Sequence, residues 1–409
     1  MSIQKHAKRV ALALIVMIVA LPQVTETIYT PSLPDVARCF FVECHMAEST
    51  LTIYLFGFAV GVAVWGNLSD LYGRKSILML GIGLYILASF FCYVSGTIEA
   101  LLASRFLQAF GGSTGSVLGQ AIARDSFAPS ERSKAFSSIS MALAFSPALG
   151  PTIGGHLDKF YGWQSVFIFL ILLGGVTLTW VWRSLPETHG GGSPQPKGSF
   201  IERLKDILTD RRVMGFAFLV GSSNGIIFSY YAEGPFYFID MLNMTPDVYG
   251  MMSIGVAAPL LLGAYTSKIL NQKGIKGEKI IMMGATFNFI FTLMFTVLAQ
   301  SEVISHRDPM SAIIISYSLV MIPAFGHALI IPNCLGLALQ KYGTNAGQAA
   351  SVFGCVYYLL ISGFTLLMGY FHNGTLKAMP TYFLALNIAN LLVIWWSFIR
   401  KAHTRAFKA

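Results

Sequence analysis

Residues 166–181 read VFIFLILLGGVTLTWV and contain no charged side chain. The run is apolar on every face of a helix, which is typical of a segment surrounded by apolar material. Residues 10–21, VALALIVMIVAL, show the same pattern. A membrane β-barrel would instead show segments of about ten residues in which apolar and polar side chains alternate. These runs therefore predict membrane-spanning α-helices.

Composition extends this prediction to the whole chain of 409 residues, of which 55% are hydrophobic and 11% charged. The mean hydropathy is +0.63. A soluble domain carries about 25% charged residues, and disordered chains have low hydrophobicity. Both classes are excluded, as is an ordinary soluble enzyme. At about 20 residues per span, twelve spans would use about 240 residues and leave short loops.

Turns and charged residues divide the chain into twelve candidate spans. We expect them near residues 9–36, 48–70, 75–95, 97–124, 131–157, 163–183, 212–240, 247–270, 278–300, 310–340, 346–371 and 378–400. The first run follows a basic start but is too long for a signal peptide and lacks a convincing cleavage site. We interpret it as a retained span of an all-α polytopic membrane protein.

The basic residues are distributed unequally between the two sides of these spans. With the N-terminus inside, 23 of the 28 Lys and Arg residues fall on the cytoplasmic side and four on the other, Arg105 lying within a span. Cytoplasmic loops carry such an excess. The bias predicts a bacterial-type inner membrane protein with both termini cytoplasmic. It also explains the net charge of +9, so nucleic-acid binding has no remaining support.

The longest connection divides the spans into six and six. It contains GGGSP at residues 190–194 and a charged stretch, residues 202–212, that could form a surface helix. We predict an N-terminal six-helix bundle over 1–183, a cytoplasmic linker over 184–211 and a C-terminal bundle over 212–409. Transporters built from parallel repeats bind substrate between such halves near the membrane midplane.

Three motifs carry a resemblance to a known family. Residues 66–75, GNLSDLYGRK, resemble the G-x-L-x-D-x-x-G-R-[KR] loop of the major facilitator superfamily, with Gly66, Asp70, Gly73 and Arg74 at its defining positions. Residues 102–108, LASRFLQ, are similar to the helix-4 arginine motif of proton-coupled members. Residues 146–155, SPALGPTIGG, resemble the antiporter motif, here represented by Pro147, Gly150, Pro151, Gly154 and Gly155.

With Glu26 ahead of YTPSLP at residues 29–34, the chain resembles the twelve-helix drug:proton antiporters of the bicyclomycin and chloramphenicol resistance type. The resemblance implies the major facilitator fold and export in exchange for protons. It also implies that Asp70 pairs with a nearby arginine and the start of helix 11 when the inner side is closed. The glycines and prolines of span 5 would either help seal the path or simply allow close packing.

Three ionisable residues inside the spans are candidates for proton coupling. Glu26 lies about 26 Å along span 1 from its inner end. An ionised carboxylate at such a depth is costly and tends to be functional, so Glu26 would either couple protons or a cationic substrate or be a structural carboxylate hydrogen-bonded to its neighbours. Arg105 lies at a comparable depth and cannot lose its proton, so it would either modulate Glu26 or hold helices 1 and 4 together. Glu233 lies further out, where it would face the cavity or reach outer water.

Aromatic and polar residues on the central spans are candidates for the substrate cavity, although each could equally serve packing. They are Tyr29, Tyr54, Asn224, Tyr230, Tyr231, Phe236, Asn333 and Tyr357. Such a lining suits a small amphipathic or cationic ligand. Cys39 and Cys44 flank an outer loop in which a disulfide would form or not with equal expectation.

The sequence therefore predicts a proton-driven antiporter that exports small amphipathic or cationic compounds, as in multidrug efflux and antibiotic resistance, by alternating access. No metal-ligand, nucleophile or ATP-binding pattern appears, so we expect no cofactor and no enzymatic activity, with the proton gradient as energy source. The expected partners are a small-molecule substrate, protons and membrane lipid, and the expected state is a monomer. Three alternatives stay open: a dedicated exporter of an endogenous metabolite such as a siderophore, proton-coupled nutrient uptake, and a membrane receptor or enzyme on the same scaffold.

Overall fold

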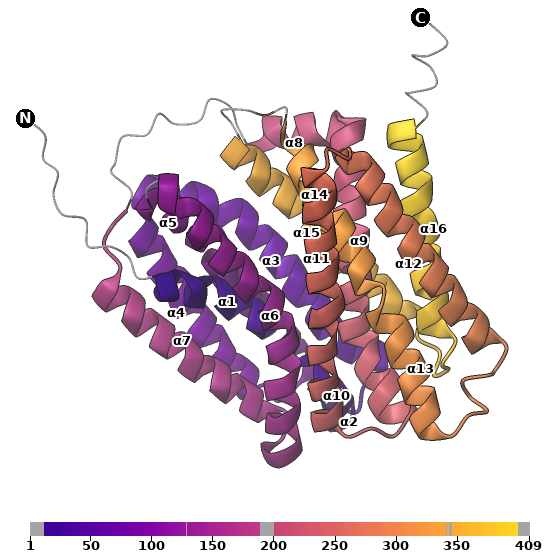
Figure 1. Cartoon of the computed structure of the whole chain (residues 1–409). Helices are drawn as coiled ribbons and strands as arrows, with labels where there is room; N and C mark the ends of the chain where they lie inside the picture. The colour runs from indigo at the N-terminus through magenta and orange to yellow at the C-terminus, as the bar shows by residue number, and fades with distance from the viewer. Residues whose placement is uncertain (1–11, 128, 189–199, 341, 343–345, 400–409) are drawn as a thin grey trace, which may run out of the picture.

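The computed structural model describes residues 12–127, 129–188, 200–340, 342 and 346–399, and these residues form helices joined by short turns (Figure 1). The predicted basic start at Lys5, Lys8 and Arg9 and the glycine-rich residues 190–194 lie outside the described residues. Residues 12–188 are called the N-terminal half below, and residues 200–399 the C-terminal half.

The N-terminal half contains seven α-helices and one 3₁₀ turn in its described part. They are α1 (Leu12–Ile28), the 3₁₀ turn Thr30–Ser32, α2 (Leu33–Phe40), α3 (Cys44–Tyr72), α4 (Arg74–Tyr93), α5 (Ile98–Ser126), α6 (Pro129–Tyr161) and α7 (Gln164–Ser184). The first helix of the other half, α8 (Phe200–Thr209), lies across one end of the bundle (Figure 1). It falls in the charged stretch for which the sequence predicts a surface helix.

The C-terminal half continues with a second set of long helices. They are α9 (Arg211–Pro235), the π-helical turn Phe236–Met241, α10 (Pro246–Met252), the 3₁₀ turn Ser253–Val256, α11 (Ala257–Gln272), α12 (Gly277–Gln300), α13 (Pro309–Met321), α14 (Ala324–Ala338), α15 (Ala346–Phe371), α16 (Ala378–Ile394) and a final π-helical turn, Trp395–Ile399. Below, the end of the bundle that bears α8 is the α8 end, and the opposite one is the α2 end (Figure 1).

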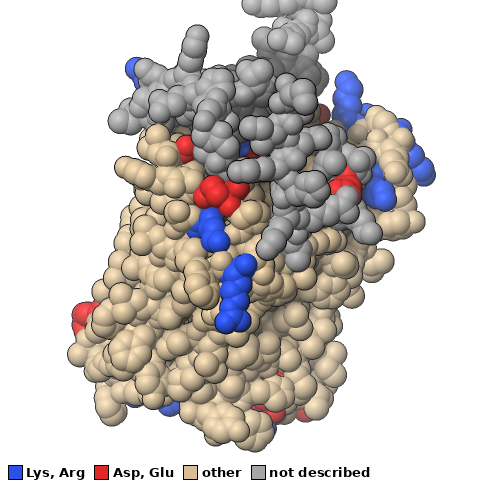
Figure 2. All heavy atoms as spheres, turned by 90° about the vertical axis from the view of Figure 1, so that its left-hand side faces the viewer, with Lys and Arg blue, Asp and Glu red and all other residues tan. Residues whose placement is uncertain are grey.

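Ten stretches of the described chain are long and apolar enough to cross a membrane. The helices α5 and α6 are equally long but more polar, and they occupy the places of the expected fourth and fifth spans. Large apolar side chains cover outward faces, among them Leu80, Leu87 and Phe90 on α4 and Leu172 and Val176 on α7. The face in Figure 2 is mostly uncharged, with a small group of acidic and basic side chains in its upper and middle part and few charged side chains below it. These features are those of a multi-pass membrane protein.

The first span is not the single helix that the sequence predicts over residues 9–36. The helix α1 ends at Ile28, and the chain passes through the 3₁₀ turn into α2, both of which carry proline at their first turn. Proline lacks the N–H that a continuous helix would need. The first span of the C-terminal half breaks similarly, because α9 ends at Pro235 and a π-helical turn follows.

Candidate functional site

A buried arginine lies at the centre of the N-terminal half. Arg105 is 0% exposed, and its guanidinium is sandwiched between the rings of Tyr29 and Tyr54, with centroids 4.9 Å and 4.4 Å away. Its Nη1 donates a 2.6 Å hydrogen bond to Oε1 of Gln108 on the same helix. Aromatic faces attract cations, so this arrangement holds a permanent positive charge away from water.

The carboxyl group of Glu26 lies in the electrostatic field of this arginine. Glu26 is 1% exposed, and its Oε1 has no hydrogen-bond partner in the part of the chain that the structure describes. Its charge also influences Tyr357 and Tyr358 of α15, which belong to the other half. The structure thus brings together the two residues that the sequence places at similar depth, and Glu26 lies within electrostatic range of the C-terminal half.

The eight cavity candidates do not form one cluster. Tyr29 and Tyr54 hold Arg105, and Tyr357 lies partly buried on the facing helix. Asn224 is half-buried on α9 and donates to the Val220 carbonyl. The remaining four lie elsewhere.

Tyr230 packs on Tyr249 of α10 within the C-terminal half. Asn333 donates 2.8 Å to Oγ of Ser267 on α11, so its contacts are with a neighbouring helix. Tyr231 and Phe236 pack against the N-terminal half at the α2 end. The residues from Tyr230 to Phe236 therefore line the interface between the halves and the aromatic core beside it.

The prolines of the span-5 motif create the acceptor that Tyr231 uses. Pro151 has no N–H, so the carbonyl of Pro147, four residues earlier, lacks its helical hydrogen bond. The hydroxyl of Tyr231 donates to this carbonyl over 3.2 Å from the opposite half. A motif in one half thus provides a binding point for the other.

The glycines of the same motif allow two close helix contacts. A Cβ atom at Gly154 would lie 1.7 Å from the carbonyl oxygen of Ile28, so α6 touches the backbone of α1 within the N-terminal half. A Cβ at Gly155 would lie 2.2 Å from the carbonyl oxygen of Pro246, at the start of α10 in the other half. Gly150 also faces α1. Small residues permit such approaches between membrane helices.

Polar contacts join the halves beside these glycines at the α2 end. Nη1 of Arg38 lies 2.8 Å from Oδ1 of Asp240, and Nζ of Lys159 lies 2.8 Å from Oδ2 of Asp247. The hydroxyl of Thr152 donates to the Gly250 carbonyl over 3.0 Å. These bonds, with that from Tyr231, make up the α2-end interface, and they close the molecule at this end.

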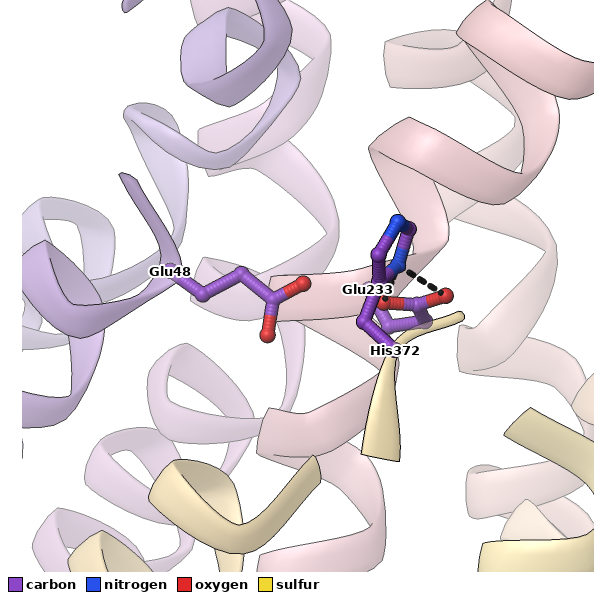
Figure 3. A group of neighbouring side chains, drawn as sticks. All are labelled: Glu48, Glu233 and His372. Atoms are coloured by element: carbon purple, nitrogen blue, oxygen red, sulfur yellow. Dashed lines mark hydrogen bonds and ion pairs between the residues drawn. The ribbon is translucent and has the colours of Figure 1, made fainter. Parts of the chain in front are cut away.

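Two acids from different helices and a histidine that follows a third helix lie close together next to this interface (Figure 3). Glu48 on α3 is 1% exposed, and Glu233 on α9 is fully buried. Nδ1 of His372, directly after α15, lies 2.8 Å from Oε2 of Glu233. The pKa of His372 lies above its ordinary value, chiefly because of its interaction with the Cys44 thiol. Glu233 therefore does not reach outer water, which was one of the two expectations for it.

The loop motif lies at the α8 end. Oδ1 of Asp70 is 2.8 Å from Nη2 of Arg74, and Nε of Arg74 is 3.5 Å from Oδ2 of Asp125. Gly73 has φ +93°, the region that favours glycine. Gly66 faces Ser351 of α15, whose hydroxyl would lie 3.3 Å from a Cβ there. Asp70 thus has the arginine partner that the resemblance implies, while residues 343–345, directly before α15, lie outside the described residues.

Cys39 and Cys44 are both free thiols in the structure, so the disulfide that the sequence left open does not form. Cys39 is exposed near the end of α2, whereas Cys44 begins α3 and is partly buried. The turn between the two helices, at Phe41, therefore carries no covalent link.

Sequence reasoning missed Glu48, His372 and Gln108. Glu48 stands at the first residue of the expected second span, where it reads as a loop acid. Its position four residues after Cys44 is a signal by which Glu48 could have been found, because residues four apart lie on the same face of a helix. His372 follows the last residue of a span and gives no such signal. The involvement of Gln108 could have been suspected from its place three residues after Arg105.

Comparison with known proteins supports a family assignment. The sequence model of the Major Facilitator Superfamily matches residues 15–365. An uncharacterised transporter of Rickettsia bellii is 34% identical over 380 residues, which are 93% of this chain and 94% of the relative. A bicyclomycin resistance protein homolog of Haemophilus influenzae is 26% identical over 339 residues, 82% and 83% of the two chains.

Solved structures agree in fold. The crystal structure of a D-xylose-proton symporter superposes with a TM-score of 0.75 over 94% of this chain and 96% of that one, at 14% identity. At that identity the likeness concerns the fold alone. The relatives are transporters rather than enzymes. The chain, whose motifs resemble those of drug:proton antiporters, therefore belongs to the Major Facilitator Superfamily.

Proposed function

We propose that this transporter is a proton-driven antiporter that exports small amphipathic or cationic compounds. The observation that carries the proposal is the buried carboxyl of Glu26, with an unpartnered oxygen, in the field of Arg105 and within electrostatic range of the other half. A carboxyl group inside the membrane must be neutralised by a proton or by a cation. Glu26 can therefore exchange one for the other.

Arg105 would determine whether the Glu26 carboxyl is protonated or is ionised and paired with a cation. The guanidinium remains charged at any physiological pH, and the rings of Tyr29 and Tyr54 hold it in place. Approach of Arg105 to Glu26 favours the ionised carboxylate, and separation favours the protonated group. A rearrangement within the N-terminal half that alters this separation would load or release a proton. Proton and substrate would then influence each other's binding reciprocally.

Alternating access would proceed by opening of the α2-end interface. The basic excess assigns the α8 end, with both termini, to the cytoplasm, so this interface would close the outer side. The ion pairs Arg38–Asp240 and Lys159–Asp247 would break when the outer side opens. The Asp70–Arg74 pair would remain at the cytoplasmic side. Glu233 is a second proton-coupling candidate within the part that moves.

The substrate class follows from the lining near Glu26. The half-buried Tyr357 and Tyr358 of α15 offer aromatic rings and hydroxyl groups within the electrostatic range of the Glu26 carboxyl. Such surroundings attract lipophilic cations and amphipathic neutral compounds. We propose a monomer in a bacterial-type inner membrane, with lipid around it and the proton gradient in place of a cofactor.

Reconstitution in liposomes tests the proposal. A pH gradient is imposed, and accumulation of a lipophilic cation and of a chloramphenicol-like neutral compound is followed for the wild type and Glu26→Gln. We expect gradient-dependent flux in the wild type and background flux in the variant, because glutamine cannot exchange a proton. The matched control is Glu99→Gln, which alters an exposed acid on α5 and should transport normally.

Full gradient-driven flux in Glu26→Gln would contradict the proton-coupling role. Absence of flux in the folded wild type with both compounds would instead favour a dedicated metabolite exporter. Proton and substrate moving in the same direction would indicate nutrient uptake. Saturable flux of any kind separates a carrier from a receptor.

A further inference from the structure

The cluster of Glu48, Glu233 and His372 lies apart from the Glu26–Arg105 pair and is made by both halves (Figure 3). One ligand atom from each residue, two carboxylate oxygens and an imidazole nitrogen, lies within 4.8 Å of the other two. Glu48 belongs to the N-terminal half, and the other two belong to the C-terminal half. The cluster therefore exists only while the α2 end is closed.

Glu48 supplies the observation that points to a ligand. It is 1% exposed, and its carboxyl group lies against that of Glu233, while no N–H or O–H donor among the residues that the structure describes hydrogen-bonds to either of its oxygens. Its side chain is directed toward Glu233 and His372 (Figure 3), and its Oε2 lies against Gly369 of α15. A buried carboxylate without a hydrogen-bond donor is costly. A cation bound between the two acids would remove that cost.

Cys44 lies beside the cluster, although its sulfur is not among the ligand atoms that lie within 4.8 Å of one another. It lies four residues before Glu48 on the first turn of α3, so both side chains share one helix face. Its thiol interacts with the imidazole of His372. With Cys44, the cluster offers two donor residues from each half, with oxygen, nitrogen and sulfur ligands among them.

We propose that Glu48, Glu233 and His372, with Cys44 as fourth ligand, bind a divalent transition-metal ion of the zinc type. Zinc takes four ligands drawn from cysteine, histidine and carboxylate side chains, and nitrogen and sulfur donors favour it over magnesium or calcium. The ligand atoms of a tetrahedral zinc site lie roughly 3.4 Å apart. Side-chain movements of about an ångström would bring the ligand atoms of Glu48, Glu233 and His372 to this spacing, and a further movement of the Cys44 side chain would supply the fourth ligand.

The position of the site gives the ion a defined effect. Its charge of +2 balances the two buried carboxylates. Because the ligands come from both halves, the ion binds only the form with a closed α2 end and increases its population. The side chain of His372 is 16% exposed and offers the route of entry from the α2 end. Bound zinc therefore holds the molecule closed on that side and slows any cycle that opens it.

Zinc binding to the purified full chain tests the site directly. Zn²⁺ is titrated at pH 7 against a chromophoric chelator, for the wild type, Glu48→Gln and His372→Gln. We expect one high-affinity ion per molecule in the wild type. Both substitutions should weaken its affinity by about tenfold or more, since disturbing a metal's ligand environment costs at least that. Zinc should also raise the melting temperature of the wild type but not of His372→Gln.

Two control variants separate this site from surface binding. Cys39→Ser removes an exposed thiol near the site, and His306→Asn removes an exposed histidine that lies 3.4 Å from Glu302. Both should bind zinc like the wild type. No high-affinity binding in the wild type, binding unchanged in His372→Gln, or binding lost in either control would overturn the proposal. His372 follows the end of α15, so its variant decides the matter even if Glu48→Gln does not fold.

Flux in liposomes gives a second readout. Zn²⁺ added at the α2 side should slow wild-type flux, and a chelator should restore it, whereas His372→Gln should be insensitive. Undiminished wild-type flux at a zinc concentration that saturates the site would contradict the closing effect. The binding titration needs no transport, so failure of the proposed antiport would not be mistaken for failure of the metal site.

Discussion

The two buried carboxyl clusters balance their charge in different ways. Glu26 lies in the field of Arg105, which belongs to the same half, so this pair persists when the halves move. Glu48 meets Glu233 and His372 of the other half, so that cluster disperses when the α2 end opens. Under the proposed mechanism, the pair within one half would carry a proton through the whole cycle, whereas the cluster between the halves would form in only one of its states.

The helix α6 shows the same contrast between a contact within one half and a contact between the halves. Gly154 of α6 fits against α1 in its own half, and the adjacent Gly155 fits against α10 of the other half. Under the proposed alternating access, the first contact would persist in every conformation, while the second would break when the α2 end opens. One short motif therefore contains a position that should govern folding and a neighbouring position that should govern conformation. Four substitutions test this division, in decreasing order of expected effect.

Gly154→Ala should have the largest effect. The added Cβ would lie 1.7 Å from the Ile28 carbonyl oxygen, so α6 and α1 would have to separate. Overpacking of this kind costs about 1–3 kcal/mol, occasionally more. We expect a large loss of folded protein, measured by size-exclusion yield and melting temperature. Gly175→Ala is the matched control, because no atom lies within 4 Å of a Cβ there. Normal stability of Gly154→Ala would show that the contact within the half is not essential.

Gly155→Ala should alter conformation while the fold persists. Its Cβ would lie 2.2 Å from the Pro246 carbonyl oxygen, which weakens the contact between the halves rather than within one. We expect faster labelling of Cys44 by a membrane-impermeant thiol reagent, with the exposed Cys39 as internal reference. Melting temperature should fall less than for Gly154→Ala. Equal loss of folded protein in the two variants would break the proposed division.

Tyr231→Phe should cause a smaller shift in the same direction. It removes the 3.2 Å hydrogen bond to the Pro147 carbonyl and leaves the ring in place. A hydrogen bond contributes about 1 kcal/mol net, so the closed form should become roughly fivefold less favoured. The Cys44 labelling rate measures this change. An unchanged rate would mean that water replaces the hydroxyl without loss.

The smallest effect is expected for an ion pair at the surface of one half. Nζ of Lys377 lies 2.8 Å from Oε1 of Glu302 and holds the pKa of that carboxyl below its usual value of 4.5. The pair's stabilisation is therefore fully present above pH 4.5 and is lost as the pH falls through the lowered pKa. Glu302→Gln should reduce the melting temperature slightly at pH 7. It should leave the melting temperature unchanged at a pH below the lowered pKa of Glu302. A large decrease, or one that persists in acid, would contradict this assignment.

The general architecture could be predicted from the sequence because lipid requires long apolar helices. Runs such as residues 166–181 have no other stable environment, and α7 occupies that stretch. Glu26 and Arg105 were predictable as candidates for a related reason, since charged groups are rare within spans. Their approach followed from similar depth in neighbouring spans.

The cluster between the halves could not be predicted in this way. Glu48 and His372 lie at the ends of spans, where ionisable residues are ordinary, and only tertiary packing encloses them. The placement of Asn333 against α11 likewise depends on packing that no periodicity encodes. The division of Gly154 and Gly155 between two interfaces depends on which helix lies on each side of α6.

The carbonyl of Pro147 has a consequence for how the α2 end would open. It has no partner within its own helix, and the hydroxyl of Tyr231 serves it only while the halves touch. Once they part, a carbonyl that lacks a donor must be hydrated. Opening is then a wetting step that depends on water activity. Osmolytes that are excluded from the protein surface should favour the dry, closed form, and the transport cycle should slow when they are added outside.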